Sequence, residues 1–394
     1  MLPGVHDGPL ARTYDVVIVG AGIQGVGLAY ELAKRGVRRI AVLDRSWPGN
    51  GASGRNGEMI RSAFSSPEWI NLFHHSLRRW HRLSAELDFN VLFSPDGYVV
   101  LASTEQQWSN LQRDARTQAA HGLRTELLDA AAMRELLPAA NPELVRGGIL
   151  QRDAGFAHHD AVVWAYLRAA ARLGVEVHAG VEVTGVRVSG GRVTGVTTAK
   201  GEVSAPIVVN AAGGGALAIN AMAGVKLPMV QSRLELLVTE PMRPFLRTAV
   251  APLELLGYCH QTKRGEFVGG TELPYTDQSA SLNGTYRLLR DMAAKWVRLF
   301  PVLSGARLLR HWAGTVTQYK DLAPVIGEMP GLSGYVVTIG WVYGFMGAPA
   351  AAELLAEAIV TGRVSPVLAP FSPQRVIEGR VIAETSLVVA SEAA

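Results

Sequence analysis

The chain has 394 residues, 48% hydrophobic and 18% charged, with 42 glycines and 20 prolines, a composition that excludes a disordered or fibrous protein and predicts two folded domains. The net charge is only +4 and the basic residues are interspersed with acids, so nucleic-acid binding is not expected. The single cysteine, Cys259, excludes an intramolecular disulfide and a multi-cysteine metal or iron–sulfur site in this chain, and no metal-binding residue is predicted.

The N-terminal half begins without a targeting signal and then shows an alternation of strand and helix. Residues 1–14 lack the apolar core of a signal peptide, and no stretch of the chain reaches the roughly 18 uncharged apolar residues of a membrane span, so we expect a cytoplasmic protein. Residues 14–20 predict a strand buried on both faces, residues 23–35 a helix that Gly36 ends, and residues 39–44 a second buried strand. Together they form a right-handed βαβ unit.

The middle of the chain predicts a loop, helices and a small insertion of strands. Residues 48–57 are too rich in glycine for a helix or strand and predict a loop that approaches a ligand closely. Beyond that loop, the pattern predicts a helix at 67–87, a hairpin at 91–102, helices within 105–137, a helix at 160–173 with Asp160 as its N-cap, and three short strands at 175–178, 181–188 and 192–198.

The C-terminal half predicts a return to the first sheet and a second, antiparallel sheet. Residues 207–213 read as a buried strand that rejoins the parallel sheet, and residues 228–275 alternate in the manner of antiparallel strands with one covered face. A helix at 281–300, a strand at 332–339, a glycine loop at 340–347 and a helix at about 350–360 complete the pattern.

The motif Gly20-Ala21-Gly22-Ile23-Gln24-Gly25 has the G-x-G-x-x-G spacing of a dinucleotide-binding turn. The spacing alone is a weak signal, but here it ends a buried strand and opens a helix, whose free N–H groups suit a pyrophosphate. Asp44 ends the next strand, where a carboxylate accepts hydrogen bonds from ribose hydroxyls. An acidic residue there disfavours NADP and leaves NAD and FAD open.

Further segments resemble those by which flavoproteins of the D-amino acid oxidase and sarcosine oxidase superfamily enclose FAD: residues 51–56, the three-stranded insertion and the loop 340–347. Within that group the chain resembles the β subunit of heterotetrameric sarcosine oxidase over nearly its whole length, in stretches such as Arg55-Asn56, Ile60-Arg61-Ser62 and Gly344-Phe345. The resemblance implies non-covalent FAD and the following contacts to it: Gly20, Gly22, Gly25, Asp44, Arg45, Ser53, Arg55, Asn56, Val183, Gly213, Gly340, Gly344 and Phe345.

The predicted fold is therefore α/β: a Rossmann-type FAD-binding domain, with a parallel sheet, helices and a three-stranded insertion, plus a second domain with an antiparallel sheet. The FAD-binding domain is predicted to be discontinuous, with segments 12–90, 149–226 and 320–375. The substrate-binding domain is predicted to comprise segments 91–148 and 227–319, and residues 376–394 are predicted to form a C-terminal tail.

The sequence allows two interpretations of the role of His159. On its residue type and position beside a helix start, it is a polar turn residue. In the family that the chain resembles, the histidine at this place carries a covalently attached FMN between the β subunit and its larger partner, so the resemblance implies an FMN linked to His159. The neighbouring His158 stands where a basic residue is expected, and its charge depends on pH.

The resemblance also nominates residues for the substrate. Arg61 matches the arginine that holds a substrate carboxylate, a role suited to a guanidinium fork. Met346 is a departure, because the family has a lysine at this place as a second cation, and this puts the substrate in question. Tyr258 and His260 lie on a predicted strand of the second domain, where they line the substrate face of the flavin or belong to the core.

The resulting hypothesis is an FAD-dependent amine oxidoreductase acting as the β subunit of a hetero-oligomer with a larger α subunit and small subunits. It would oxidise a secondary amine or N-substituted amino acid by hydride transfer from carbon to flavin N5, giving an imine. Two alternatives remain open: an opine or D-amino acid dehydrogenase that passes electrons to a partner or quinone, and a flavin-holding subunit without turnover.

Overall fold

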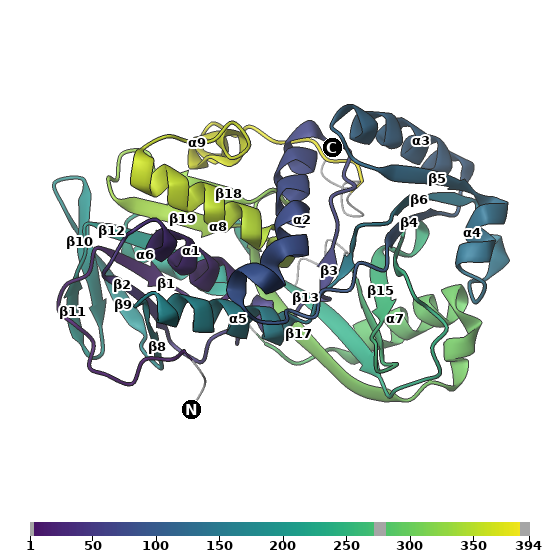
Figure 1. The fold of residues 1–394 in the computed structure, drawn as a ribbon, viewed down its shortest axis with the longest axis horizontal. Helices are drawn as coiled ribbons and strands as arrows, with labels where there is room; N and C mark the ends of the chain where they lie inside the picture. Colours follow the sequence, from purple (N-terminus) through teal and green to yellow (C-terminus); the bar gives the residue numbers. More distant parts are fainter. Residues whose placement is uncertain (1–3, 272–280, 387–394) are drawn as a thin grey trace.

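A computed structural model describes residues 4–271 and 281–386. One half of the molecule is built on a six-stranded sheet in which the β1 strand, Val16–Val19, lies near the middle and is buried on both faces (Figure 1). The strands are parallel, except that β18 pairs antiparallel with β19. In spatial order the sheet comprises β18 Val325–Glu328, β19 Tyr335–Ile339, β12 Ile207–Asn210, β1, β2 Ile40–Asp44 and β8 Glu176–Ala179.

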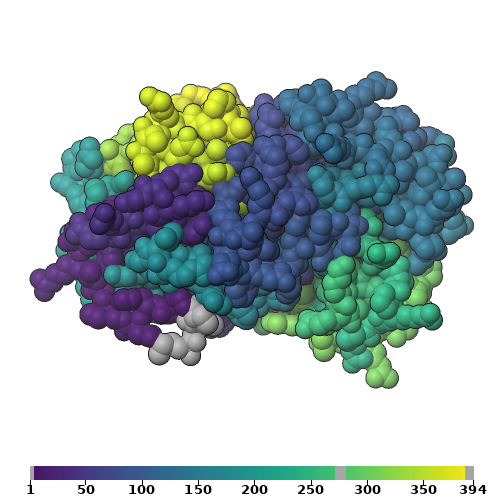
Figure 2. Space-filling view, viewed as in Figure 1, coloured from purple at the N-terminus to yellow at the C-terminus, as the bar shows by residue number. Residues whose placement is uncertain are grey.

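Packed helices adjoin this sheet. Helix α1, Ile23–Lys34, contacts both α8, Gly344–Thr361, and α5, His159–Arg172, and α8 also contacts α2, Pro67–Leu87. The space-filling view shows residues of α2 between the α8 and α3 sides of the molecule (Figure 2). The β1–α1–β2 unit and the helix at 67–87 confirm the sequence predictions.

Two helix starts differ from the predictions. Helix α8 begins at Gly344 rather than near residue 350, so part of the predicted glycine loop is helical. Helix α5 begins at His159 with His158 as the N-cap, so the prediction that Asp160 is the N-cap is wrong. Asp160 instead provides an acidic side chain in the first turn, where it complements the helix dipole.

A three-stranded antiparallel sheet forms the mid-chain insertion, but its members differ from those predicted. It comprises β9 Val183–Ser189, β10 Arg192–Thr198 and β11 Gly201–Ser204. The predicted strand at 175–178 is β8, which pairs with β2 at the edge of the parallel sheet. The missed strand β11 is short and polar, and it begins directly after a tight turn, at Gly201, which has a φ of +116°.

The other half of the molecule is an eight-stranded sheet, antiparallel apart from one parallel pair between β14 and β4. Its core also includes side chains of helices α4, Ala130–Leu136, and α7, Tyr286–Leu299. In spatial order the strands are β17 Leu308–Gln318, β13 Val230–Thr239, β16 Phe267–Thr271, β15 Gly257–Gln261, β14 Ala249–Pro252, β4 Tyr98–Ala102, β6 Gly147–Gln151 and β5 Thr125–Asp129.

Two predictions in this half are wrong. Residues 91–102 do not form a hairpin: only β4 is a strand here, and it pairs with β6 and β14, while Ser94 bridges to Phe156. The stretch 105–137 is not wholly helical, because β5 separates helix α3, Glu105–Ala120, from α4. Strand β5 is a polar edge strand with no buried residue, so it lacks the apolar alternation by which strands are recognised.

The α/β fold class is confirmed, with a largely parallel sheet and a separate, largely antiparallel one. The domain boundaries stay a prediction, and the one drawn after residue 148 cuts through β6. A small sheet pairs β3, Met59–Ile60, with β7, Gly155–Phe156, and α9, Pro373–Ile377, is the last helix within the described residues.

The predicted C-terminal tail folds back onto the molecule as far as the structure describes it. The Glu384 carboxylate accepts hydrogen bonds from the backbone N–H groups of Ser65 and Ser66 at the start of α2. Among the described residues, α8 is the helix long and apolar enough to cross a membrane, but 67% of it is buried inside the fold, as in a core helix.

Candidate functional site

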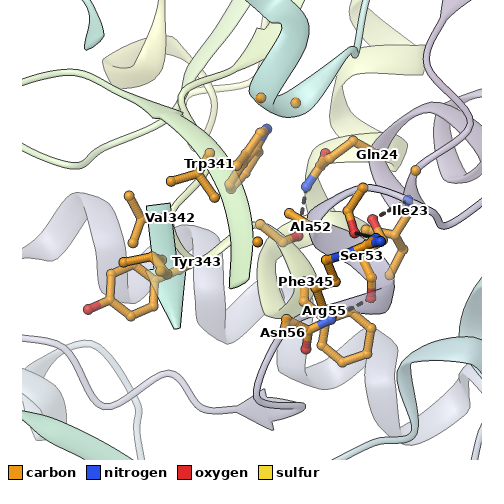
Figure 3. A pocket seen from close by; sticks show the side chains of 18 of the residues that line it. Ile23, Gln24, Ala52, Ser53, Arg55, Asn56, Trp341, Val342, Tyr343 and Phe345 are labelled. Carbon is orange, nitrogen blue, oxygen red and sulfur yellow. Dashed lines mark hydrogen bonds between the residues drawn. The ribbon is translucent and has the colours of Figure 1, made fainter. Parts of the chain in front are cut away.

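A cavity of about 1370 Å³, including its opening to solvent, lies between the two large sheets. It brings together segments that are far apart in the sequence (Figure 3). The lining comes from the glycine turn after β1, Asp44, residues 51–53 and 55–59, Tyr98, residues 211–214, Leu234 and Leu236 of β13, Tyr258, residues 314–317 and residues 338–346.

The glycines of the turn have separate roles. Gly20 has a φ of +110°, and a Cβ there would lie 2.5 Å from the Ala211 carbonyl oxygen. A Cβ on Gly25 would lie 1.9 Å from the Gly20 carbonyl oxygen, so Gly25 is required for packing, and it does not line the cavity. Gly22 lines the cavity, and a Cβ there would meet only the Ser53 hydroxyl, at 3.0 Å. Gly22 is therefore the glycine that opens the start of α1 to a ligand.

Asp44 is held at the cavity wall by backbone donors. Its Oδ2 accepts from the Ala21 N–H at 2.8 Å, and its Oδ1 accepts from the Ser46 N–H at 2.8 Å. A carboxylate has about four acceptor positions, so both oxygens keep capacity for ligand hydroxyls. Ser53, on the loop after β2, accepts from the Ile23 N–H at 2.9 Å and thereby fixes that loop against the N-terminus of α1.

The late glycine segment is tied to the same helix. Gln24 of α1 donates from Nε2 to the Gly344 carbonyl at 2.7 Å, and Thr338 donates to Gln24 Oε1 at 3.3 Å (Figure 3). Trp341 donates in turn from Nε1 to the Thr338 hydroxyl at 2.9 Å. A Cβ on Gly344 would lie 2.7 Å from that of Trp341, so the turn is closely packed.

Tyr258 and Met346 line the cavity. A Cβ on Gly57 would lie 2.1 Å from Cε2 of Tyr258, so the ring packs directly on that glycine. The Met346 carbonyl accepts hydrogen bonds from the Ser76 hydroxyl at 2.5 Å and from Trp80 Nε1 at 2.9 Å. The backbone that carries the Met346 side chain is thus anchored from α2.

Arg61 lies outside the cavity lining and is 2% exposed. Its guanidinium carbon is 4.0 Å from the Phe64 ring centroid, 5.5 Å from that of Tyr98 and 5.9 Å from that of Tyr343. Tyr98 and Tyr343 both line the cavity, so the cation lies close to aromatic residues of its wall. The carboxylate-binding role of Arg61 stays a prediction.

Glu58 forms a buried carboxylate centre at the cavity wall. Its Oε1 lies 2.6 Å from His159 Nδ1, and its Oε2 lies 3.3 Å from His260 Nε2. Burial alone raises the pKa of Glu58, but the hydrogen bonds from His159 and His260 outweigh this effect and hold that pKa far below its ordinary value. Burial lowers the pKa of His159, but the contacts with Glu58, aided by the Asp160 charge and a backbone hydrogen bond at Gly54, outweigh burial and raise that pKa overall. The pair therefore favours carboxylate and imidazolium.

Several residues nominated from the sequence lie outside the lining. Arg45 is exposed, Val183 is buried at the start of β9, and His260 is 0% exposed beside Phe156, with ring centroids 4.3 Å apart. His159 lies behind Glu58. The nominated residues that do line the cavity are Gly20, Gly22, Asp44, Ser53, Arg55, Asn56, Gly213, Tyr258, Gly340, Gly344, Phe345 and Met346.

Three parts of the cavity wall were not predicted from the sequence: Glu58, Tyr98 and the cavity face of β13. The alternation of Leu234 and Leu236 within an apolar and polar pattern is a signal for that face, because residues two apart on a strand point the same way. Glu58 carried no such signal. Its partners lie far along the chain, and its left-handed backbone, with a φ of +64°, is uncommon for a residue other than glycine.

Comparisons with known proteins agree with this geometry. Residues 15–358 match the family described as FAD dependent oxidoreductase. The sarcosine oxidase β subunit of Rhodobacter capsulatus is 32% identical over 382 residues, covering 95% of this chain and 91% of that protein. The β subunit from an Arthrobacter species is 34% identical, covering 95% and 93%.

A solved structure is similar over the same length. The L-proline dehydrogenase from P. horikoshii superposes with a TM-score of 0.90 at 29% sequence identity, covering 95% of this chain and all of that one. The chain belongs to the FAD dependent oxidoreductase family.

The cavity fits the FAD that this family uses. Gly22 allows a backbone approach, the N-terminus of α1 offers N–H groups to anionic oxygens, and Asp44 offers acceptors to ribose hydroxyls. These residues would hold the ADP half of the cofactor. A larger side chain at Gly22 would fill the approach to the helix start.

Proposed function

We propose that this FAD-dependent oxidoreductase oxidises the C–N bond of a secondary amine or N-substituted amino acid as the β subunit of a hetero-oligomer. The proposal rests mainly on its likeness to sarcosine oxidase β subunits over nearly the whole length of both chains. It is supported by one continuous cavity that joins the nucleotide-binding turn to Tyr258 and Met346.

The protein would contribute binding and orientation to the reaction. When bound, FAD would supply the hydride acceptor for oxidation of the carbon next to an unprotonated amine nitrogen, and the product would be an imine that water hydrolyses. Tyr258 and Met346 would shape the substrate space. Arg61 would supply positive charge for a carboxylate, and the aromatic wall would limit water.

A cyclic secondary amino acid is a second candidate substrate. The likeness to an L-proline dehydrogenase supports it, and so does the character of the lining, where Tyr98, Tyr258, Tyr343 and Met346 provide apolar surface beside the buried cation of Arg61. Such a surface suits a compact hydrocarbon ring better than a strongly hydrated group.

The test is anaerobic addition of sarcosine, larger N-alkyl amino acids and proline to the purified holoprotein. We expect at least one of them to bleach the flavin absorbance, and the rate of reoxidation by air then distinguishes an oxidase from a dehydrogenase. A flavin that no amine bleaches, in a complex purified with its partner chains, would support the flavin-holding subunit instead.

We also propose that an FMN is attached to His159 in the assembled complex with a larger α subunit and small subunits. Glu58 occupies Nδ1 of this imidazole and so fixes its orientation, while the side chain stays partly exposed. Intact mass measured after denaturation tests this. An active complex whose chain has its unmodified mass would contradict the attachment. The cytoplasmic location also stays a prediction.

A further inference from the structure

The N-terminal segment, residues 4–12, passes the edge of the six-stranded sheet. The edge strand is β8 (Figure 1). The His6 N–H donates to the Val177 carbonyl of this strand at 2.8 Å. Thr13 then bridges to Ser204 in β11. The N-terminal segment thus covers an edge that would otherwise expose backbone groups.

Four side chains with metal-binding atoms meet at this edge. Glu176 and His178 are two residues apart on β8 and therefore face the same way. His178 Nε2 lies 3.2 Å from Glu176 Oε2 and 3.5 Å from the Tyr14 hydroxyl, which itself donates to Glu176 Oε2. The His6 ring lies edge-on to that of His178 with centroids 5.1 Å apart, and a ligand atom from each of His6, Glu176 and His178 lies within 4.8 Å of the others.

These separations suit a small tetrahedral ion. Zinc binds histidine nitrogen and carboxylate oxygen at about 2.0–2.2 Å, so two ligands of one tetrahedral site lie about 3.3 Å apart. The distance of 3.2 Å between His178 Nε2 and Glu176 Oε2 matches this separation without movement of the strand. His6 comes from a terminal segment and can close the remaining gap by a change of side-chain rotamer.

We propose that His6, Glu176 and His178 form a binding site for a divalent zinc-like cation that fastens the N-terminal segment to β8. Tyr14 would complete the site either as the fourth ligand, through its hydroxyl oxygen, or indirectly, through its hydrogen bond to Glu176. Two imidazoles and one carboxylate with a further oxygen form a donor set typical of zinc.

No sequence motif predicts the site, because its ligands come from the N-terminal segment and from β8, which are separated by most of the first half of the chain.

The experiment uses the full-length holoprotein after removal of metals with a chelator, and the probes are Zn²⁺ alone, by calorimetry, and Co²⁺, by its visible spectrum. We expect saturable binding of one Zn²⁺ per chain at this site, and with Co²⁺ the intense visible absorption of a tetrahedral complex. His6→Ala changes an exposed side chain, and Glu176→Gln keeps the shape of the strand. Each substitution should weaken the affinity of this site for Zn²⁺ by at least about tenfold and leave the FAD content unchanged. The matched control His121→Ala, at a half-exposed histidine outside the cluster, should bind Zn²⁺ as the parent does.

A second cluster requires its own control, because Glu58, His158 and His159 also place three ligand atoms within 4.8 Å of one another. If the bound equivalent survives His6→Ala and Glu176→Gln and disappears in His158→Ala, the ion lies beside the flavin cavity and the proposal is wrong. Absence of any saturable binding would overturn it equally.

Limited proteolysis tests the fastening itself. Arg12 is exposed at the end of the N-terminal segment, so trypsin cleavage after it reports on release of this segment. Zn²⁺ should slow cleavage in the parent protein and in His121→Ala, but not in His6→Ala. Equal cleavage rates with and without Zn²⁺ in the parent would show that the ion does not hold the segment.

Discussion

Nδ1 of His159 lies 2.6 Å from Oε1 of Glu58, at the wall of the cavity that fits FAD. The contact joins the first residue of α5 to the loop that precedes β3, and His260 approaches the other carboxylate oxygen from β15. One carboxylate thus connects the FAD-binding half of the molecule to the antiparallel half. Its charge state should affect both stability and the position of His159.

The first prediction concerns Glu58→Gln. The pKa of Glu58 is lowered by folding, so its contribution to stability is present above the unfolded value of 4.5 and is lost as the pH falls. The pKa of His159 is raised, so its contribution is present below the unfolded value of 6.5 and is lost as the pH rises through the folded value. The substitution should therefore lower the free energy of unfolding most between about pH 4.5 and 6.5, by about 1–3 kcal/mol.

Chemical denaturation across this pH range measures the effect. The matched control is Glu126→Gln, which breaks an exposed pair with Arg152 and should change the free energy of unfolding little at any pH. If Glu58→Gln shows the same small, pH-independent change as the control, the carboxylate does not hold a charged His159.

The second prediction separates two glycines of one motif. Gly22→Val should leave a folded protein without FAD, because Gly22 has an extended backbone and its Cβ would meet only the movable Ser53 hydroxyl while blocking the ligand. Gly25→Ala should instead lower the free energy of unfolding by several kcal/mol, since its Cβ would overlap the Gly20 carbonyl oxygen. The flavin-to-protein absorbance ratio and thermal unfolding distinguish the two. Stoichiometric FAD in Gly22→Val would contradict the placement of the pyrophosphate.

The parts of this fold that could be predicted have local causes. The run Val16–Val19 followed by Gly20 specifies a buried strand and a tight turn within a few residues, and the structure confirms both. Strand β5 was not predicted, because it is held as a strand by its pairing with β6 and not by an apolar pattern of its own. The contact of Glu58 with His159 and His260 depends on how three distant segments pack, and no local pattern contains that information.

The third prediction tests the role of Arg61. Arg61→Lys should raise the KM of amino-acid substrates by roughly ten- to a hundredfold while leaving that of matching amines without a carboxylate nearly unchanged. Lysine keeps the charge but loses the planar group that lies 4.0 Å from the Phe64 ring centroid and can pair with two carboxylate oxygens. If the variant affects both kinds of amine equally, Arg61 is a packing residue of the cavity wall.

The last prediction concerns Met346, which lines the cavity and whose backbone is anchored through Ser76 and Trp80. One charge-assisted contact to a carboxylate contributes about 1.5–3 kcal/mol, and each 1.4 kcal/mol corresponds to a factor of ten, so a thioether here should make sarcosine a poor substrate. Met346→Lys should improve kcat/KM for sarcosine by roughly ten- to a hundredfold and impair bulkier, less polar amines, whereas the matched control Met346→Leu should leave this preference in place. Steady-state kinetics on sarcosine and larger secondary amines measure both effects. A parent enzyme that already uses sarcosine efficiently, together with no gain in the lysine variant, would place the substrate carboxylate away from Met346.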